Sequence, residues 1–244
     1  MYNSRMDEVV EPALYLVPVS LGASLLEKVV TPYNRKIVLN IRRFVVEDRK
    51  SAVRFLLGLD KKMNIDACSF SELSEHTKKS DVAQMLLPLE RREAVALMSE
   101  AGCPAVGDPG SLLVSLAHKK GLRVVPLAGA NSMVMALMAS GFNGQSFAFN
   151  GYLPIDSKAL SSKLRFYESR VYKENRTQIF IETPYRNARL FSALLKTCKD
   201  TTLLCVASGL TTNDEAIAVK SIAQWKKSPA PPFEKIPAIF LIYK

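Results

Sequence analysis

Residues 99–110 are the part of this sequence best suited to holding a small molecule. The segment reads SEAGCPAVGDPG, with three glycines and two prolines. It follows an apolar run at 94–98 that predicts a buried strand and precedes an apolar-periodic run at 112–117 that predicts a helix. Loops at the carboxyl ends of parallel strands bind ligands, and small residues let a ligand approach the backbone. The segment therefore predicts a ligand loop, although Asp108-Pro109 is also an ordinary helix start.

Two further loops share this composition of small residues. One covers residues 18–22 after the first expected strand, and the other covers 126–132 before a helix. Asn131 and Ser132 can cap that helix, which is the ordinary account of both residues. Because carboxyl ends of parallel strands meet at one edge of a sheet, we expect the three loops to line one pocket. Neither the glycine pattern of dinucleotide sites nor a phosphate loop is present.

The elements that must position these loops alternate along the first half of the chain. We expect strands at 13–19, 44–46, 94–98 and 122–126, and helices at 25–30, 51–59, 80–92, 111–120 and 131–140. This alternation predicts a mainly parallel sheet with right-handed crossovers. The helix expected over 25–30 stops at Pro32, and the helix expected over 80–92 contains Pro88, which does not suit a helix interior.

A turn-rich zone at 141–154 separates this half from the second. We expect an N-terminal α/β domain over 1–145 and a C-terminal α/β domain over 150–244. The second half contains expected helices at 157–172 and 185–195, and expected strands at 178–181, 202–207, 215–220 and 236–243. Strands outnumber helices near the end, which predicts a mixed sheet.

Composition narrows the class of protein. The 244 residues are 48% hydrophobic and 23% charged, which are ordinary values for globular chains with a full core. Apolar runs are too short for a membrane span, and no signal peptide is recognisable. The four cysteines and two histidines are scattered without metal-ligand spacing. We therefore expect a cytoplasmic protein with reduced thiols, no metal and no membrane partner.

Net charge points to a polyanionic partner. The chain carries +10 in total, of which +3 lies in residues 1–154 and +7 in the shorter segment 155–244. Cations are densest over 158–176, where Phe166, Tyr167 and Tyr172 lie among them. Aromatic rings among cations can stack on unpaired bases, which favours nucleic acid. The alternative is a solvated helix face whose aromatic residues belong to the core.

A set of motifs gives the chain a family resemblance that runs from residue 13 to its C-terminus. These motifs are Leu14–Pro18, Glu47-Asp48, Ser99–Pro104, Asp108–Gly110, Val124–Gly129, Gly151–Pro154 and Ile179–Arg186. Together they resemble the tetrapyrrole methylase superfamily, and within it the small-subunit ribosomal RNA methyltransferase I branch. The 99–110 loop is the most specific part of this resemblance.

The resemblance implies a two-domain α/β methyltransferase, usually a homodimer, with S-adenosylmethionine in the cleft between the domains. The acceptor it implies is a ribose 2′-hydroxyl of ribosomal RNA in the small subunit. The cofactor contacts it implies here are Pro18, Gly22, Glu100, Ala101, Gly102, Cys103, Pro104, Asn131, Ser132, Glu182 and Leu210.

Several positions depart from the family pattern. Glu100 and Cys103 replace Asp and Thr, Ala128 replaces Pro, and Ser208-Gly209 stands where Arg-Glu is typical. Cofactor binding should survive, because backbone contacts dominate such loops. Two alternative functions stay open: a methylase of a tetrapyrrole or another small acceptor, and an RNA-binding relative that has lost catalysis through the Ser208-Gly209 change.

Methyl transfer from a sulfonium depends mainly on orientation of the acceptor, with a positioned base as an additional aid. Among the carboxylates we favour Glu182, which ends a strand, as the catalytic residue, and we expect Glu100 to bind a cofactor hydroxyl or ammonium. The RNA-contact candidates are Arg43, Lys163, Arg165 and Arg186. Surface ion pairs are the ordinary fate of such cations.

Overall fold

The computed structural model describes residues 10–22, 25–233 and 235–244. These residues form two compact units, the first made of 10–20 and 25–130, the second of 21–22, 131–233 and 235–244. This division comes earlier than the expected boundary at 145–150. The reason is that helix α6 (Ser132–Ser140) buries Ala136 and Leu137 in a core cluster with strands of the second unit.

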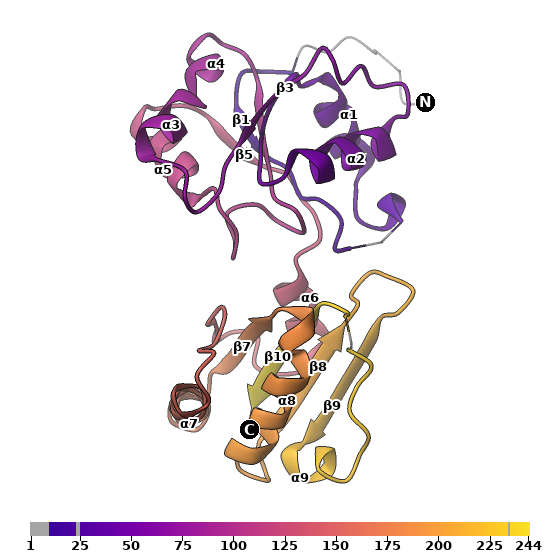
Figure 1. Cartoon of the computed structure of the whole chain (residues 1–244), viewed down its shortest axis with the longest axis vertical. Helices are drawn as coiled ribbons and strands as arrows, with labels where there is room; N and C mark the ends of the chain where they lie inside the picture. Colours follow the sequence, from indigo (N-terminus) through magenta and orange to yellow (C-terminus); the bar gives the residue numbers. More distant parts are fainter. Residues whose placement is uncertain (1–9, 23–24, 234) are drawn as a thin grey trace. The chain divides into compact units, whose positions relative to one another are not determined.

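The first unit is built on a parallel five-stranded sheet (Figure 1). Its strands, in the spatial order β3-β2-β4-β1-β5, are β3 (Ser69–Glu72), β2 (Arg43–Val46), β4 (Val95–Met98), β1 (Leu14–Leu16) and β5 (Val124–Pro126). Every pairing in it is parallel. The predicted parallel sheet is confirmed.

Helices cover both faces of this sheet, because alternate side chains of a strand point to opposite faces. Phe44 and Val46 join a core cluster with α1 (Pro32–Asn40) and α2 (Arg49–Leu59). Val45 joins a second cluster with residues of the other helices. These are α3 (Lys79–Gln84), α4 (Leu87–Glu90) and α5 (Ser111–Lys119).

Two helix predictions in the first unit are wrong, and proline explains both. The expected helix at 25–30 is only the short 3-10 helix η1 (Leu26–Lys28), and Pro32 begins α1 instead of ending a helix. Thr31 caps α1 by accepting from the Asn34 amide at 3.1 Å. The expected helix over 80–92 is broken into α3 and α4, with Pro88 in the first turn of α4. Proline suits a first turn, where its missing N–H has no intrahelical partner.

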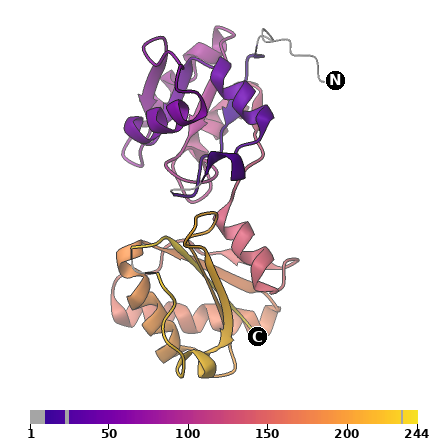
Figure 2. The ribbon, with the colours of Figure 1, turned by 90° about the vertical axis from the view of Figure 1, so that its right-hand side faces the viewer.

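The second unit contains a mixed five-stranded sheet, as predicted. Its spatial order is β6 (Phe147–Phe149), β7 (Thr177–Glu182), β10 (Ala238–Tyr243), β8 (Leu203–Ser208) and β9 (Ala216–Ser221). Only the β6–β7 pairing is parallel among those of the described residues. One core cluster joins the sheet to α7 (Ser157–Glu174), α8 (Asn187–Thr197) and α9 (Ile222–Trp225), while α6 packs on the opposite face (Figure 2).

Helix α7 is fixed in rotation by a buried carboxylate. Glu168 is 6% exposed and accepts hydrogen bonds from the Lys199 amide at 2.7 Å and the Thr202 hydroxyl at 2.5 Å. Leu164 is fully buried on the same face. Residues on the other face, including Phe166, are therefore held at the surface.

The residues described in the structure include no helix with both the length and the apolarity needed to cross a bilayer. Helix α7 has the length, with 18 residues, but it carries a row of lysines and arginines. Its charge suits a surface position.

Candidate active site

The loop after β4 leaves the first sheet at the point where the helices that follow neighbouring strands change from one face of the sheet to the other. Strand β4 lies between β2 and β1. The chain runs from β1 and β2 to α1 and α2 on one face, but from β4 to α5 on the other. A crevice opens outside the carboxyl ends of parallel strands at such a switch point. Residues 99–110 therefore occupy the position in this sheet best suited to a ligand.

The three loops predicted to share an edge touch one another within the first unit. The Val19 amide donates to the Gly102 carbonyl at 2.9 Å, which joins the first loop to the second. The Cys103 thiol donates to the Ala130 carbonyl at 3.4 Å, which joins the second loop to the third. The predicted convergence of the loops is therefore present for residues 18–20, 99–110 and 127–130.

Gly129 makes the closest of these approaches possible. A Cβ atom built on Gly129 would lie 2.3 Å from Cβ of Pro18 and 2.6 Å from its Cγ. A proline ring cannot rotate away, so a side chain at residue 129 would separate the first and third loops. The Asn34 side-chain amide also donates to the Ala128 carbonyl at 2.6 Å, which fixes the third loop against α1.

Carboxylates gather beside the second loop. Glu47, directly after β2, accepts a hydrogen bond from the Glu100 amide at 3.1 Å. Burial, followed by repulsion from Glu47 and Asp48, raises the pKa of Glu100. Burial and then repulsion from Glu47 raise the pKa of Asp108 to about 6, although a hydrogen bond from Ser99 acts in the opposite direction. We call Glu47, Glu100 and Asp108 the acidic rim.

Asp108 does not cap the helix that follows it, contrary to the ordinary reading of Asp108-Pro109. Helix α5 begins at Ser111, and its N-cap is Gly110, with φ of 128° and no side-chain hydrogen bond. Asp48 is the genuine cap of this region, since its Oδ2 accepts from the Ser51 amide at 2.7 Å. The carboxylate of Asp108 therefore remains in the acidic rim.

This rim can stabilise a compact cationic ligand, because its negative charges repel one another in a half-buried position. Among the described residues, no group of three or more His, Cys, Asp and Glu side chains could hold a metal ion. An organic cation that is also bound by loop backbone is the better match to the rim.

The predicted catalytic residue, Glu182, ends β7 in the second unit and is 8% exposed. Its Oε1 accepts from Arg186 Nε at 2.8 Å and lies 2.7 Å from Arg186 Nη2. The Thr183 amide donates to the same oxygen at 2.8 Å. These contacts hold the 3-10 helix η2 (Pro184–Arg186) against the strand, so Glu182 positions Arg186.

Four other predicted cofactor contacts belong to the second unit. Asn131 caps α6, with Oδ1 accepting from the Met133 and Val134 amides at 3.1 Å each, and Ser132 is the first helical residue. Leu210 is 6% exposed and packs in the core cluster beneath α6, so its side chain is occupied by core packing. A methyl group at Gly22 would lie 3.9 Å from Thr212, which places residue 22 beside the loop after β8. The cofactor roles of all four remain predictions.

The four cations predicted to contact RNA have different surroundings. Arg43, at the amino end of β2, pairs with Glu93 at 2.6 Å, on the sheet edge opposite to the ligand loops. Arg43 therefore forms a surface ion pair, which was the alternative to an RNA contact. Lys163 and Arg165 are exposed on α7, and Arg186 is 20% exposed.

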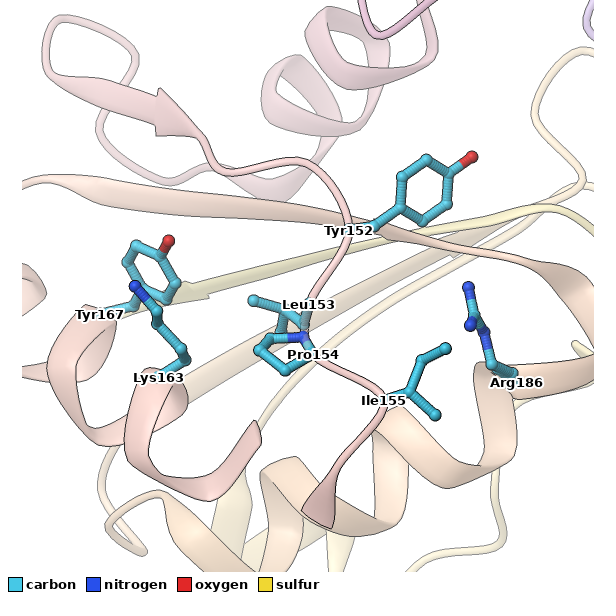
Figure 3. Close-up of a pocket in the computed structure, with 7 residues that line it drawn as sticks. All are labelled: Tyr152, Leu153, Pro154, Ile155, Lys163, Tyr167 and Arg186. Carbon is cyan, nitrogen blue, oxygen red and sulfur yellow. The ribbon is translucent and has the colours of Figure 1, made fainter. Parts of the chain in front are cut away.

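Lys163 and Arg186 line a hollow of about 490 Å³ in the second unit (Figure 3). The other lining residues are Tyr152, Leu153, Pro154, Ile155 and Tyr167. Sequence reasoning selected the two cations but did not place the 152–155 turn beside them. The sequence feature that could have indicated this surface is the run Gly151–Ile155, in which Tyr152 and Ile155 flank a Leu-Pro pair.

Solved structures define the class of fold. The methyltransferase CobJ matches with a TM-score of 0.62 and 17% identity over 95% of this chain and 94% of that chain. The uroporphyrin-III-C-methyltransferase of Thermus thermophilus matches with a TM-score of 0.52, also at 17% identity, over 96% of this chain and 94% of that one. The fold is that of the two-domain tetrapyrrole methylases.

Sequence relatives define the family more closely, although no family model matches the chain. The "Ribosomal RNA small subunit methyltransferase I" of Vibrio cholerae is 31% identical over 213 residues, which are 87% of this chain and 70% of the relative. The protein of the same name from Escherichia coli O157:H7 is 29% identical over 88% of this chain and 72% of the relative. The chain belongs to the ribosomal RNA small subunit methyltransferase I family.

The shared span is shorter for other members of this family. The Halalkalibacterium halodurans protein is 41% identical over 112 residues, or 46% of this chain and 37% of the relative. The Pasteurella multocida protein is 33% identical over 64% of this chain and 55% of the relative.

The packing of Gly129 against Pro18 predicts the effect of a single methyl group. Gly129→Ala should lower the free energy of unfolding by about 1–3 kcal/mol, because the added carbon forces the loops apart. Gly144→Ala is the matched control, since a Cβ there meets no atom within 4 Å. Urea denaturation of both variants measures the difference. Equal stability of the two variants would show that the loops do not pack as described.

The pKa of Asp108 predicts a pH-dependent effect on stability. A folded-state pKa of about 6, above the ordinary 3.8, means that ionisation of Asp108 destabilises the folded protein as the pH rises through this interval. Asp108→Asn should therefore exceed the wild type in free energy of unfolding by about 1 kcal/mol near neutral pH, after allowance for solvent screening. The two proteins should converge near the ordinary pKa of Asp. A difference that is the same at both ends of the range would contradict this assignment.

Proposed function

We propose that this chain transfers a methyl group from S-adenosylmethionine to a ribose 2′-hydroxyl of small-subunit ribosomal RNA. The observation that carries the proposal is the contact among the three small-residue loops at the switch point of the first sheet, beside the acidic rim. Membership of the ribosomal RNA small subunit methyltransferase I family supports the acceptor. The net charge of +7 over residues 155–244 supports a polyanionic substrate.

The carboxylates beside the loops fit the positive charge of this cofactor. S-Adenosylmethionine carries two positive centres, a sulfonium and an ammonium, and supplies an electrophilic methyl group when bound. Glu100 and Asp108 have raised pKa values because burial and neighbouring carboxylates disfavour their charged forms, so nearby positive charge would stabilise both. In the first unit we assign the contacts to Pro18 and residues 100–104. In the second unit Gly22, Asn131, Ser132, Glu182 and Leu210 remain the proposed contacts.

The chain's own contribution to the reaction is mainly orientation. Holding an acceptor oxygen in line with the methyl carbon can supply roughly 7–11 kcal/mol of the barrier. Glu182 contributes by fixing Arg186 through their ion pair. Asp108, in the acidic rim beside the second loop, is the carboxylate that we propose to take up the hydroxyl proton.

The homodimer that the resemblance implies and the cytoplasmic location expected from the scattered cysteines also belong to this proposal. A methylase of a tetrapyrrole or another small acceptor is the competing function, suggested by the names of the structural neighbours. Methyl-labelled cofactor separates the two. The proposal requires label in small-subunit RNA from cells lacking the endogenous enzyme, at a linkage that resists alkali. Label in an added porphyrinoid but not in RNA would support the competing function.

The acidic rim should distinguish a ligand that carries a sulfonium charge from one that does not, and this difference tests the cofactor site. Glu100→Gln should weaken binding of S-adenosylmethionine about 5-fold more than binding of S-adenosylhomocysteine, because only the former carries the sulfonium charge. Glu11→Gln is the control, since Glu11 pairs with Arg123 at the amino end of β1. Calorimetric titration of each variant with each ligand gives the ratio. Unchanged affinity for both ligands would remove the acidic rim from the cofactor site, and an equal loss for both would place Glu100 at the ammonium or a ribose hydroxyl instead of the sulfonium.

A further inference from the structure

We propose that the hollow beside the 152–155 turn binds one unstacked nucleotide of single-stranded RNA. This inference rests on the proposed function and specifies how the substrate is held. The hollow lies wholly in the second unit, between the 152–155 turn, α7 and η2. Its volume of about 490 Å³ falls in the range of about 300–1,000 Å³ typical of small-molecule sites.

The turn supplies the surface on which a base can stack. Tyr152 is 55% exposed and Ile155 is 65% exposed, so an aromatic and an aliphatic side chain of one turn both reach the surface. Figure 3 shows Leu153 and Pro154 in the middle of the hollow, with Tyr152 and Ile155 toward Arg186. Tyr167, half-buried, adds a second ring on the opposite side. Stacking on such rings tolerates any base, because every base has a π face.

Cations lie at both ends of this apolar surface. Lys163 lies on the same side as Tyr167, and Arg186 lies on the other (Figure 3). The guanidinium of Arg186 pairs with Glu182 and lies 5.5 Å from the centre of the Tyr185 ring, and these contacts fix its position at the hollow. No acidic residue is among the described residues that line the hollow. The arrangement favours a ligand with an apolar ring and a phosphate on each side.

The surface continues from the hollow along α7. Phe166 is 49% exposed, with Lys163 Nζ 5.8 Å and Arg170 Cζ 5.5 Å from its ring centre. An exposed ring between two cations is a second stacking position, one helical turn from the hollow. A duplex cannot use either position, because its bases are already stacked. Single-stranded RNA is therefore favoured over duplex RNA.

Fluorescence anisotropy with a labelled single-stranded RNA of mixed sequence tests the site, with its blunt duplex as the comparison probe. Tyr152→Ala and Lys163→Ala should each weaken binding of the single strand about 5- to 10-fold. Lys163→Ala should also reduce the salt dependence of binding by about one phosphate contact. Duplex binding should change less than about 2-fold, because non-specific phosphate contacts are spread over many cations.

Two control variants match these changes elsewhere on the chain. Lys173→Ala removes an exposed cation from α7 outside the hollow, and Tyr33→Ala removes a 60% exposed ring from the first unit. Both should bind the single strand like the wild type. The inference is overturned if the hollow variants match these controls, or if polyglutamate displaces the RNA as well as polyuridylate does.

Failure of the proposed methyltransferase function can be distinguished from failure of the nucleotide site. A wild-type protein that transfers no label to ribosomal RNA would fail as a methyltransferase of that RNA, whatever the hollow binds. Hollow variants that bind and methylate RNA normally would overturn only the nucleotide site. Binding of S-adenosylhomocysteine, unchanged in every hollow variant, verifies that these proteins are folded.

Discussion

The close approach of loop backbones at the carboxyl edge of the first sheet is the constraint on which the candidate site depends. Strands β4, β1 and β5 are neighbours and parallel, so their loops emerge side by side. Side-chain volume would normally keep such loops apart. Gly129 against Pro18 and the Val19–Gly102 pairing allow them to touch. The small residues of these loops are thus required by packing as well as by any ligand.

Charge is segregated in a way that suits two different ligands. Three carboxylates collect beside the loops of the first unit, where Glu100 and Asp108 have raised pKa values. In the second unit, the carboxylates near the cations are already engaged: Glu182 pairs with Arg186, and Glu168 is buried in hydrogen bonds. On α7, the exposed Lys163 and Arg165 are available to an anion, whereas Arg170 pairs with Glu174. A cationic cofactor and an anionic acceptor would each meet the opposite charge.

Much of the fold could be predicted because its signals are local. Apolar runs and small-residue loops identify β4, α5, β5 and α6 with nearly the right limits. Proline is compatible both with the end and with the first turn of a helix, so its effect was mispredicted. Pro32 was expected to end a helix and Pro88 to disturb one, but each lies in the first turn of a helix. Strand β3, with the sequence SFSE, was missed because a polar edge strand has little periodic signal.

The site was predictable in its loops and less so in its side-chain partners. Asp108 looked like a helix cap, and only the position of Gly110 shows that its carboxylate joins Glu47 instead. Glu182 was correctly placed at a strand end, but its ion pair with Arg186 depends on a single helical turn that the sequence does not specify. The hollow was missed because Tyr152, Lys163 and Arg186 meet only in three dimensions.

Hydrogen–deuterium exchange with and without S-adenosylhomocysteine tests the central claim most directly. If the loops bind the cofactor together, amides in peptides covering residues 18–22, 99–110 and 126–132 should all be protected by the ligand, while α7 is unaffected. Protection confined to one loop, or found only outside the three, would contradict a shared cofactor site at this edge of the sheet.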